Sequence, residues 1–219
     1  MSLRLEFVLV LLGGLLLACV AGYVNTMMLL LGAPPVTHLT GSISRLSADI
    51  GHLNFEDAKV VGSLVVSFLL GAMLAGVLLH SSNLRLGRRY GVAIIIESLI
   101  LFIAAMLMGA ASCAAAGAGL QNAMAASYRN MIIRTTHMTG ILTDLGFLRG
   151  QTLKGQRRRG RQVLMLSSLL IAFLFGGVIG AIVGADDPRH GLLIPSALLA
   201  LMGLAYFVLR RLRWFRADP

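Results

Sequence analysis

Two short polar segments contain the side chains of this chain that are best suited to chemistry. Residues 37–41 read Thr-His-Leu-Thr-Gly, and the pattern returns 99 residues later, at 136–140, as Thr-His-Met-Thr-Gly. Histidine can bind a ligand or take up a proton near neutral pH, threonine hydroxyls form hydrogen bonds, and glycine allows close backbone approach. The residues of these segments that we predict to bind a substrate are Thr37, His38, Thr40, Gly41, Thr136, His137, Thr139 and Gly140.

Side-chain amides precede each segment within an apolar stretch. Asn25 comes before the first segment, and Gln121 and Asn122 come before the second, 13 to 16 residues ahead of the respective histidine. An amide in lipid needs a hydrogen-bond partner, and a purely structural bond between helices contributes about 0.6 kcal/mol. The paired placement also predicts that the three amides converge on the substrate site.

Three charged residues lie where charge is costly in a membrane. Arg45 and Asp144 are 99 residues apart, so they occupy equivalent positions after the two histidines. They would form an ion pair if the two polar segments meet, whereas both would be solvated if the segments lie at opposite surfaces. Glu97 stands alone in an apolar run, where an ionised acid costs about 2.5 kcal/mol or more, and it is the first candidate for proton coupling.

The residue spacing gives little support to metal or covalent chemistry. His38, His137 and Asp144 could serve a membrane-embedded enzyme as acid, base or ligands, but the sequence has no nucleophile motif and no metal-ligand spacing. Cys19 and Cys113 both lie in apolar runs and form no CxxC motif. We therefore expect no metal and no cofactor, and a protein that is not an enzyme.

The composition places these residues in a membrane protein. Of 219 residues, 57% are hydrophobic and 13% are charged, whereas ordinary soluble domains have about 25% charged residues. A water-soluble enzyme is thereby excluded. Long charge-free stretches instead predict an all-α membrane protein with about six transmembrane helices. The predicted spans lie near residues 7–31, 60–80, 91–111, 113–130, 162–184 and 191–210.

The net charge of +10 is interpreted as a signal of topology, with no nucleic acid required. Basic residues gather at 85–89, at 149–161 and after 209, and the positive-inside rule assigns these parts and both termini to the cytoplasm. The bilayer is thus the expected partner. Small residues at four-residue spacing predict close helix packing and would also allow a homodimer. They are Gly14, Ala18, Gly22, Gly176, Gly180 and Gly184.

The predicted spans and the polar segments repeat together. The offset that relates the two Thr-His-x-Thr-Gly segments also carries the second and third spans onto the fifth and sixth. Units 1–111 and 112–219 then hold three spans each within one membrane domain, and the second must enter the membrane from the opposite side. Pro34 and Pro35 must end the helix before the first segment, so each segment is predicted to begin a broken or half-helix; an interfacial helix is the alternative.

Several of these motifs resemble those of the bacterial YoaK family of integral membrane proteins, over nearly the whole chain. Gly119-Leu120-Gln121-Asn122 and the segment 135–140 stand as in the family, whereas Asn25 and Ser42 replace the usual Asp and Asn. The resemblance implies a multi-pass bacterial protein of uncharacterised activity. Together with the charge pattern it predicts the bacterial inner (plasma) membrane as the location.

The leading functional hypothesis is a small secondary transporter or permease. One three-span unit would rock against the other around the two half-helices, which gives alternating access. Helix N-termini, amides and hydroxyls favour a small polar solute, an anion or a zwitterion. Three alternatives stay open: a channel, the membrane-embedded enzyme described above, and a structural or regulatory protein whose basic loop binds anionic lipid.

Overall fold

The computed structural model describes residues 3–37, 39–79, 88–107, 110–127, 135–154, 160–186 and 190–211, and this part of the chain is entirely helical. The all-α fold class is confirmed. The five longest helices are α1 (Leu3–Leu30), α3 (Phe55–Leu78), α4 (Arg88–Met106), α7 (Gly160–Asp186) and α8 (Leu193–Arg211). The shorter elements are α2 (Thr40–Gly51), α5 (Ala111–Ala126), α6 (Met138–Leu153) and the 3-10 turn η1 (His190–Leu192).

Five helices of the described ranges are long and apolar enough to cross a membrane: Leu11–Leu30, Phe55–Leu78, Arg88–Met106, Gly160–Ala185 and His190–Arg211. A multi-pass membrane architecture is thus supported, with five such helices where the sequence predicts six. The remaining predicted span, 113–130, overlaps α5, whose 16 residues reach only about 24 Å at 1.5 Å per residue. Half of those residues are buried by other helices, so α5 needs less lipid-facing surface than its neighbours.

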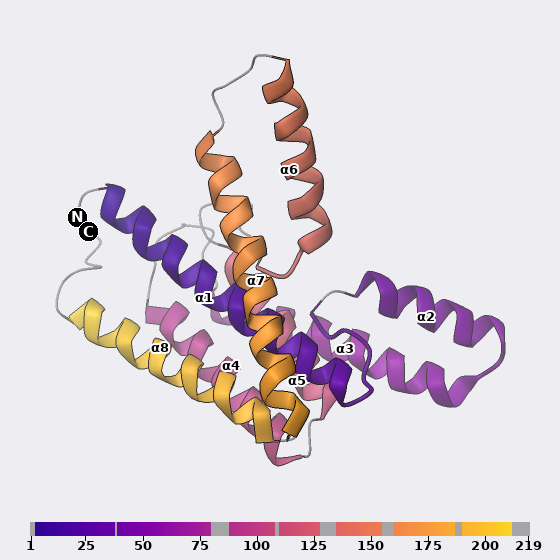
Figure 1. The fold of residues 1–219 in the computed structure, drawn as a ribbon. Helices are drawn as coiled ribbons and strands as arrows, with labels where there is room; N and C mark the ends of the chain where they lie inside the picture. Colours follow the sequence, from indigo (N-terminus) through magenta and orange to yellow (C-terminus); the bar gives the residue numbers. More distant parts are fainter. Residues whose placement is uncertain are drawn as a thin grey trace.

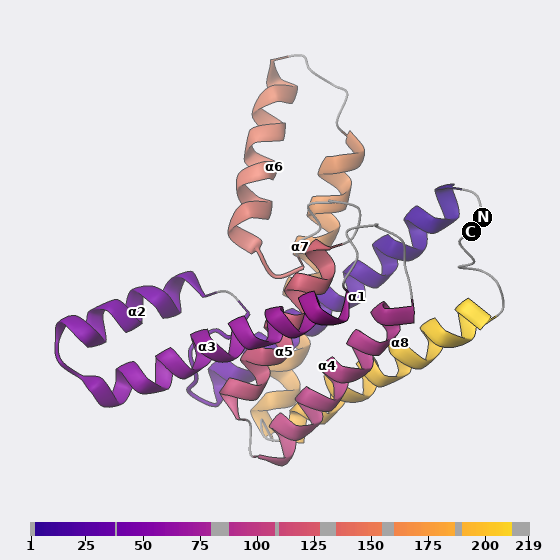
Figure 2. The ribbon, with the colours of Figure 1, turned by 180° about the vertical axis from the view of Figure 1, so that it is seen from behind.

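The long helices pack as three crossing pairs, α1 with α7, α3 with α5, and α4 with α8 (Figure 1). Figure 2, from behind, shows α3 beside α5 and α4 beside α8. Glycine makes the first two crossings close. A Cβ at Gly22 would collide with the carbonyl oxygen of Phe173, and a Cβ at Gly119 would collide with that of Phe68. Small residues therefore set the helix spacing, as their four-residue pattern predicts.

A second set of glycines completes each crossing from the partner helix. A Cβ at Gly176 of α7 would collide with the carbonyl oxygen of Cys19, and a Cβ at Gly71 of α3 would collide with that of Ala116. Each crossing thus has at least one glycine from each of its two helices, facing the backbone of the other helix. Side chains larger than hydrogen would push both pairs apart.

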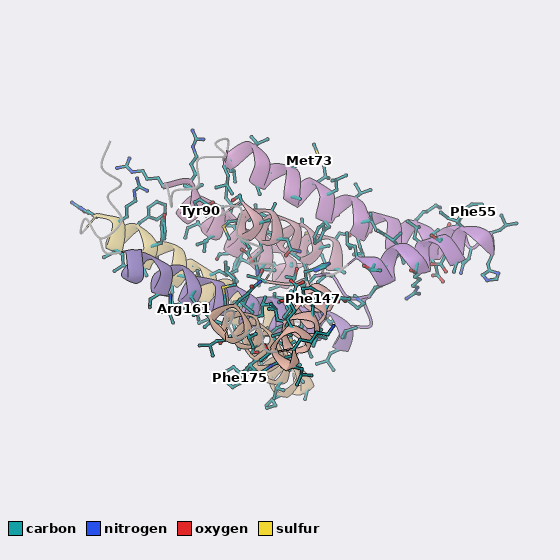
Figure 3. The ribbon with its side chains drawn as sticks, turned by 90° about the horizontal axis from the view of Figure 1, so that it is seen from above. Phe55, Met73, Tyr90, Phe147, Arg161 and Phe175 are labelled. Atoms are coloured by element: carbon teal, nitrogen blue, oxygen red, sulfur yellow. The ribbon has the colours of Figure 1, made fainter. Side chains whose placement is uncertain are left out.

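Two helical arms extend from the bundle. The first is α2, which folds back along the beginning of α3, and the second is α6, which folds back along the beginning of α7. The arms point in different directions in Figure 1, and α2 does not contact α6. Figure 3 shows Phe55 at the far tip of the first arm, well separated from Phe147 of α6. Each polar helix is therefore packed within its own half of the chain.

The break after α1 follows from local sequence. Gly32 has a φ of 76°, a conformation that glycine adopts without strain. Its N–H donates to the carbonyl of Leu29 at 3.0 Å, and the N–H of Ala33 donates to that of Met28 at 2.9 Å. This pair of bonds is the Schellman motif that closes helix ends. Pro34 follows at once and cannot continue the helix, so the chain leaves α1 and turns back toward the bundle.

Candidate functional site

The first polar segment is tied to α1 by the Asn25 amide. Asn25 Oδ1 accepts a hydrogen bond from the Thr37 hydroxyl at 3.0 Å and one from the Thr37 backbone N–H at 3.4 Å. Both residues are buried. Because a buried amide without partners is costly, these bonds hold the chain after the proline break against the helix that precedes it.

The second polar segment repeats this link and adds another. The Thr136 hydroxyl donates to Oδ1 of Asn122. One residue earlier, Gln121 Nε2 donates to the hydroxyl oxygen of Thr135 at 3.0 Å and to the carbonyl oxygen of Leu17 in α1 at 2.9 Å. Gln121 and Thr135 are both buried. Gln121 therefore connects its own segment to the helix that opens the first half of the chain.

The Gln121 link has no polar counterpart in the first half. Counting from Asn25 and Thr37, the positions that correspond to Gln121 and Thr135 are Val24 and Val36. Both valines are buried in the main apolar core. Each half thus has one asparagine-to-threonine link, and the second half alone has a further polar bridge through Gln121.

The other predicted residues of the two segments lie away from this network. Those that are exposed, on or next to α2 and α6, are Thr40, Gly41, His137 and Thr139. Gly140 is half-buried beside the imidazole of His137, which a Cβ at this position would strike. His38 lies outside the described residues, so its role stays a prediction. The structure therefore gathers Asn25, Thr37, Gln121, Asn122 and Thr136 in the interior and leaves the exposed members outside it.

Arg45 and Asp144 are not brought together. Arg45 Nε lies 3.8 Å from Oδ2 of Asp49, one turn further along α2. The arm that carries Arg45 makes no contact with the arm that carries Asp144. Of the two alternatives, an ion pair or two separate charges, the structure shows separate charges, because each polar helix packs on the next helix of its own half. Within the described ranges no three His, Cys, Asp or Glu side chains are grouped so that they could hold a metal ion.

Glu97 is the only charged residue that is buried among the described side chains, with 2% of its surface exposed. Its Oε2 has no hydrogen-bond partner in the described part of the chain. The next residue, Ser98, donates to the carbonyl oxygen of Ser196 at 2.8 Å, and the Ser196 hydroxyl donates back to that of Ser98 at 2.9 Å. Glu97 thus directly precedes a residue of the α4–α8 crossing, and its buried carboxyl, with Oε2 unpartnered, would be strongly disfavoured in the ionised form.

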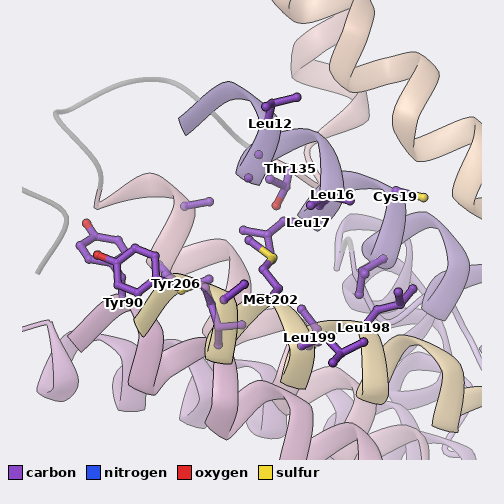
Figure 4. Close-up of a pocket in the computed structure, with 18 of the residues that line it drawn as sticks. Leu12, Leu16, Leu17, Cys19, Tyr90, Thr135, Leu198, Leu199, Met202 and Tyr206 are labelled. Atoms are coloured by element: carbon purple, nitrogen blue, oxygen red, sulfur yellow. The ribbon is translucent and has the colours of Figure 1, made fainter. Parts of the chain in front are cut away.

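A cavity of about 500 Å³ lies between α1 and α8, and α4, α5 and Thr135 contribute the rest of its wall (Figure 4). Its lining is mainly apolar, with Leu17, Leu199 and Met202 among the residues labelled in Figure 4. Tyr90 and Tyr206 stand close together at one end of the view. The cavity meets the polar network at two places, because Leu17 and Thr135, the partners of Gln121, both belong to the lining.

Sequence reasoning missed this cavity because its walls are ordinary apolar residues from helices far apart in the chain. Gly13 was a local signal, since it leaves space on α1: a Cβ there would have only the Met202 methyl group within 4 Å, at 3.6 Å. Tyr90 and Tyr206, two of the few polar groups on the wall, lie near predicted span ends, a place that interfacial aromatic residues commonly occupy. Only their joint position in space marks them as cavity residues.

The sequence profile of a protein family of unknown function, DUF1275, matches residues 13–205 of this chain. The chain belongs to that family. The matched region contains most of the cavity lining, both amide-to-threonine links and Glu97. The match is consistent with the YoaK-like membership expected from the motifs. No curated protein and no solved structure matches the chain.

Proposed function

We propose that this protein is a small secondary transporter that alternates access to the α1–α8 cavity, built from two inverted three-span units, 1–111 and 112–219. Reciprocal contacts support the two units. Gly22 faces Phe173 as Gly119 faces Phe68, and the two serines at the α4–α8 crossing exchange equivalent hydrogen bonds. In a twofold relation, a residue of one unit contacts a position of the other unit, and the equivalent residue of the other unit makes the same contact in return.

The observation that carries the proposal is a difference between two equivalent helix pairs. In the proposed repeat, α1 corresponds to α5 and α8 to α4, so the α1–α8 pair corresponds to the α5–α4 pair. α5 packs extensively on α4, whereas α1 makes few contacts with α8 and the cavity separates them. An inverted-repeat transporter has one such side open and the other closed, and exchange of the two arrangements produces the opposite state.

The open side is assigned to the cytoplasm in this proposal. The beginning of α1 and the end of α8 lie at the same end of the bundle (Figure 1), and the positive-inside rule places that end inside the cell. The units would rock about the chain breaks after α1 and α5. Buried polar residues would stabilise these breaks: Asn25, Thr37, Gln121, Asn122 and Thr136. The bacterial inner membrane, the cytoplasmic termini and the absence of enzymatic chemistry belong to the same proposal.

Glu97 is the proposed proton-coupling site. It is one helical turn from Ile94, which lines the cavity, and it adjoins the crossing that must shift when the units rock. Uptake and release of a proton would change its charge where no partner compensates it. Glu97→Gln should preserve folding and remove the pH dependence of transport, measured as uptake into proteoliposomes under an imposed pH gradient. Leu99→Ala, at an exposed position of α4, is the neighbour control, and unchanged pH dependence in Glu97→Gln would overturn the assignment.

Side-specific cysteine labelling tests alternating access itself. Cys19 and Cys113 are first replaced by alanine, and single cysteines are then introduced at Met202, on the cavity wall, and at Ala104, its buried counterpart on α4. A membrane-impermeant thiol reagent should label Met202→Cys from one side of the membrane only, and Ala104→Cys from the opposite side only. Each cysteine should react more slowly when the protein is held in the conformation that exposes the other cysteine. Leu204→Cys, which is exposed on the outer face of α8, is the lipid-facing control.

The alternatives give different labelling patterns. A channel would label both positions from both sides at once. A structural or regulatory protein that keeps the described arrangement would label Met202→Cys and never Ala104→Cys. Either pattern would contradict the transporter proposal.

A further inference from the structure

We propose that the solute of the α1–α8 cavity is an amphipathic organic anion, whose apolar body lies in the cavity and whose carboxylate faces the arginine-bearing ends of α4 and α8. The inference rests on the proposed transport function for the solute's passage, whereas the binding site itself stands on the cavity's chemistry. It replaces the small polar solute expected from the sequence with a solute that has a substantial apolar part.

The cavity wall selects an apolar body. The volume of about 500 Å³ lies within the range of sites that enclose small organic molecules. Leucine, methionine and isoleucine side chains form most of the surface. A small polar ion placed there would lose its hydration shell and meet few groups that replace it. An alkyl or aromatic body gains free energy in the same place, because it leaves water for an apolar surface.

The charge at one end of the cavity selects an anion. Arg88 and Arg89 directly precede the cavity residue Tyr90, and Arg210 and Arg211 directly follow the cavity residue Leu209. Within the described start of α1, start of α4 and end of α8, Glu6 is the one acidic residue. The net positive charge attracts a carboxylate toward this end.

The two arginine-bearing helix ends adjoin each other at the cavity. A Cβ at Gly91 of α4 would lie 2.8 Å from the ring of Tyr206 in α8. Next to it, the Tyr90 hydroxyl lies 2.8 Å from the hydroxyl oxygen of Ser127. The Ser127 hydroxyl in turn donates to the carbonyl oxygen of Met124 at 2.8 Å, so both hydroxyls already use their hydrogens within the protein. The arginine guanidinium groups are therefore the donors at this end that would bind a carboxylate.

The positive-inside rule would place arginines at this end of the bundle with or without a ligand, so the test must separate binding from topology. The purified protein is placed in phosphatidylcholine nanodiscs, and equilibrium dialysis measures the binding of labelled octanoate, 1-octanol and acetate. Octanoate should bind saturably, about tenfold more tightly than 1-octanol, and its affinity should fall with added salt. Acetate, which lacks the apolar body, should show no saturable binding.

Two variants locate the site. Gly13→Phe places a ring in the cavity opposite Met202 and should weaken octanoate binding at least tenfold. Gly76→Phe, at an exposed position of α3 with no atom within 4 Å of the added Cβ, is the matched control and should bind as the parent does. Arg88→Gln with Arg89→Gln leaves the cavity intact and should weaken octanoate by roughly threefold to tenfold while 1-octanol is unchanged. Arg149→Gln with Arg161→Gln, on the second arm, is its charge-matched control.

Each other outcome overturns the inference. Acetate binding as tightly as octanoate would show that the apolar cavity does not contribute to recognition. Equal affinity for octanoate in Gly13→Phe and Gly76→Phe would show the same. Equal affinity for octanoate and 1-octanol would show that the arginines do not contribute to binding. Displacement of octanoate by phosphatidylglycerol added to the nanodiscs would assign the cavity to a membrane lipid. Octanoate binding in a protein that fails the labelling test would refute transport alone, whereas successful labelling without octanoate binding would refute this solute class alone.

Discussion

The α1–α8 and α4–α5 pairs correspond to each other in the proposed repeat, yet the first borders a half-open cavity and the second is closed. On the closed side, a Cβ at Gly117 of α5 would touch Leu101 of α4 at 3.5 Å. On the open side, the corresponding helices are held apart, and Leu17 of α1 instead accepts a hydrogen bond from α5. The comparison teaches that a few side-chain differences can bias a pair of similar halves toward one of two arrangements.

The largest expected effect concerns what the two halves share. Gly22→Ala and Gly119→Ala should each lower the free energy of unfolding by about 1–3 kcal/mol or more, because the methyl group meets a backbone carbonyl of the partner helix. Gly76→Ala meets nothing and should be neutral or stabilising, since alanine is the better helix former. Denaturant titration in mixed micelles measures the three. A Gly22→Ala protein as stable as Gly76→Ala would show that the crossing is looser than described.

The next effect concerns what the halves do not share. Gln121→Val should destabilise the protein by about 1–3 kcal/mol, because it leaves the buried Thr135 hydroxyl without its donor. The double variant Gln121→Val with Thr135→Val copies the Val24 and Val36 arrangement of the first half. It should recover part of the loss, and a double-mutant cycle measures the recovery. Strictly additive losses of stability would mean that the Gln121 and Thr135 side chains are not energetically coupled.

The smallest effect concerns the arms. Arg45→Ala removes an ion pair whose arginine side chain is 53% exposed, so the loss should be only about 0.3–0.5 kcal/mol. The swap of Arg45→Asp with Asp144→Arg should give no recovery over the single changes, because the two arms do not meet. Thermal unfolding of the four proteins checks both statements. A double swap more stable than either single variant would show that the arms approach each other in another state.

Local features account for what could be predicted from the sequence. Charge-free stretches predict the long helices, because spanning length depends on composition alone. The spacing of Gly176 and Gly180 predicts close packing on one helix face, because residues four apart share that face. The structure shows that the partner on this face is α1. Amides in lipid are expected to need hydrogen-bond partners, and Asn25 and Asn122 each bind a threonine of their own segment. Their convergence on a substrate site stays a prediction. In all of these features the partners are near in sequence or repeat at a fixed spacing.

The sequence by itself determined that this protein is a helical membrane protein, where α1 breaks, and which residues in the two halves play equivalent parts. Hydropathy, proline geometry and helical periodicity act over a few turns, so they can be read along the chain. Only the tertiary structure decided that α2 and α6 pack on their own halves, that Arg45 and Asp144 stay apart, and that α1 and α8 enclose a cavity. These outcomes depend on which faces of distant helices meet, and crossing angles and close glycine contacts set that choice.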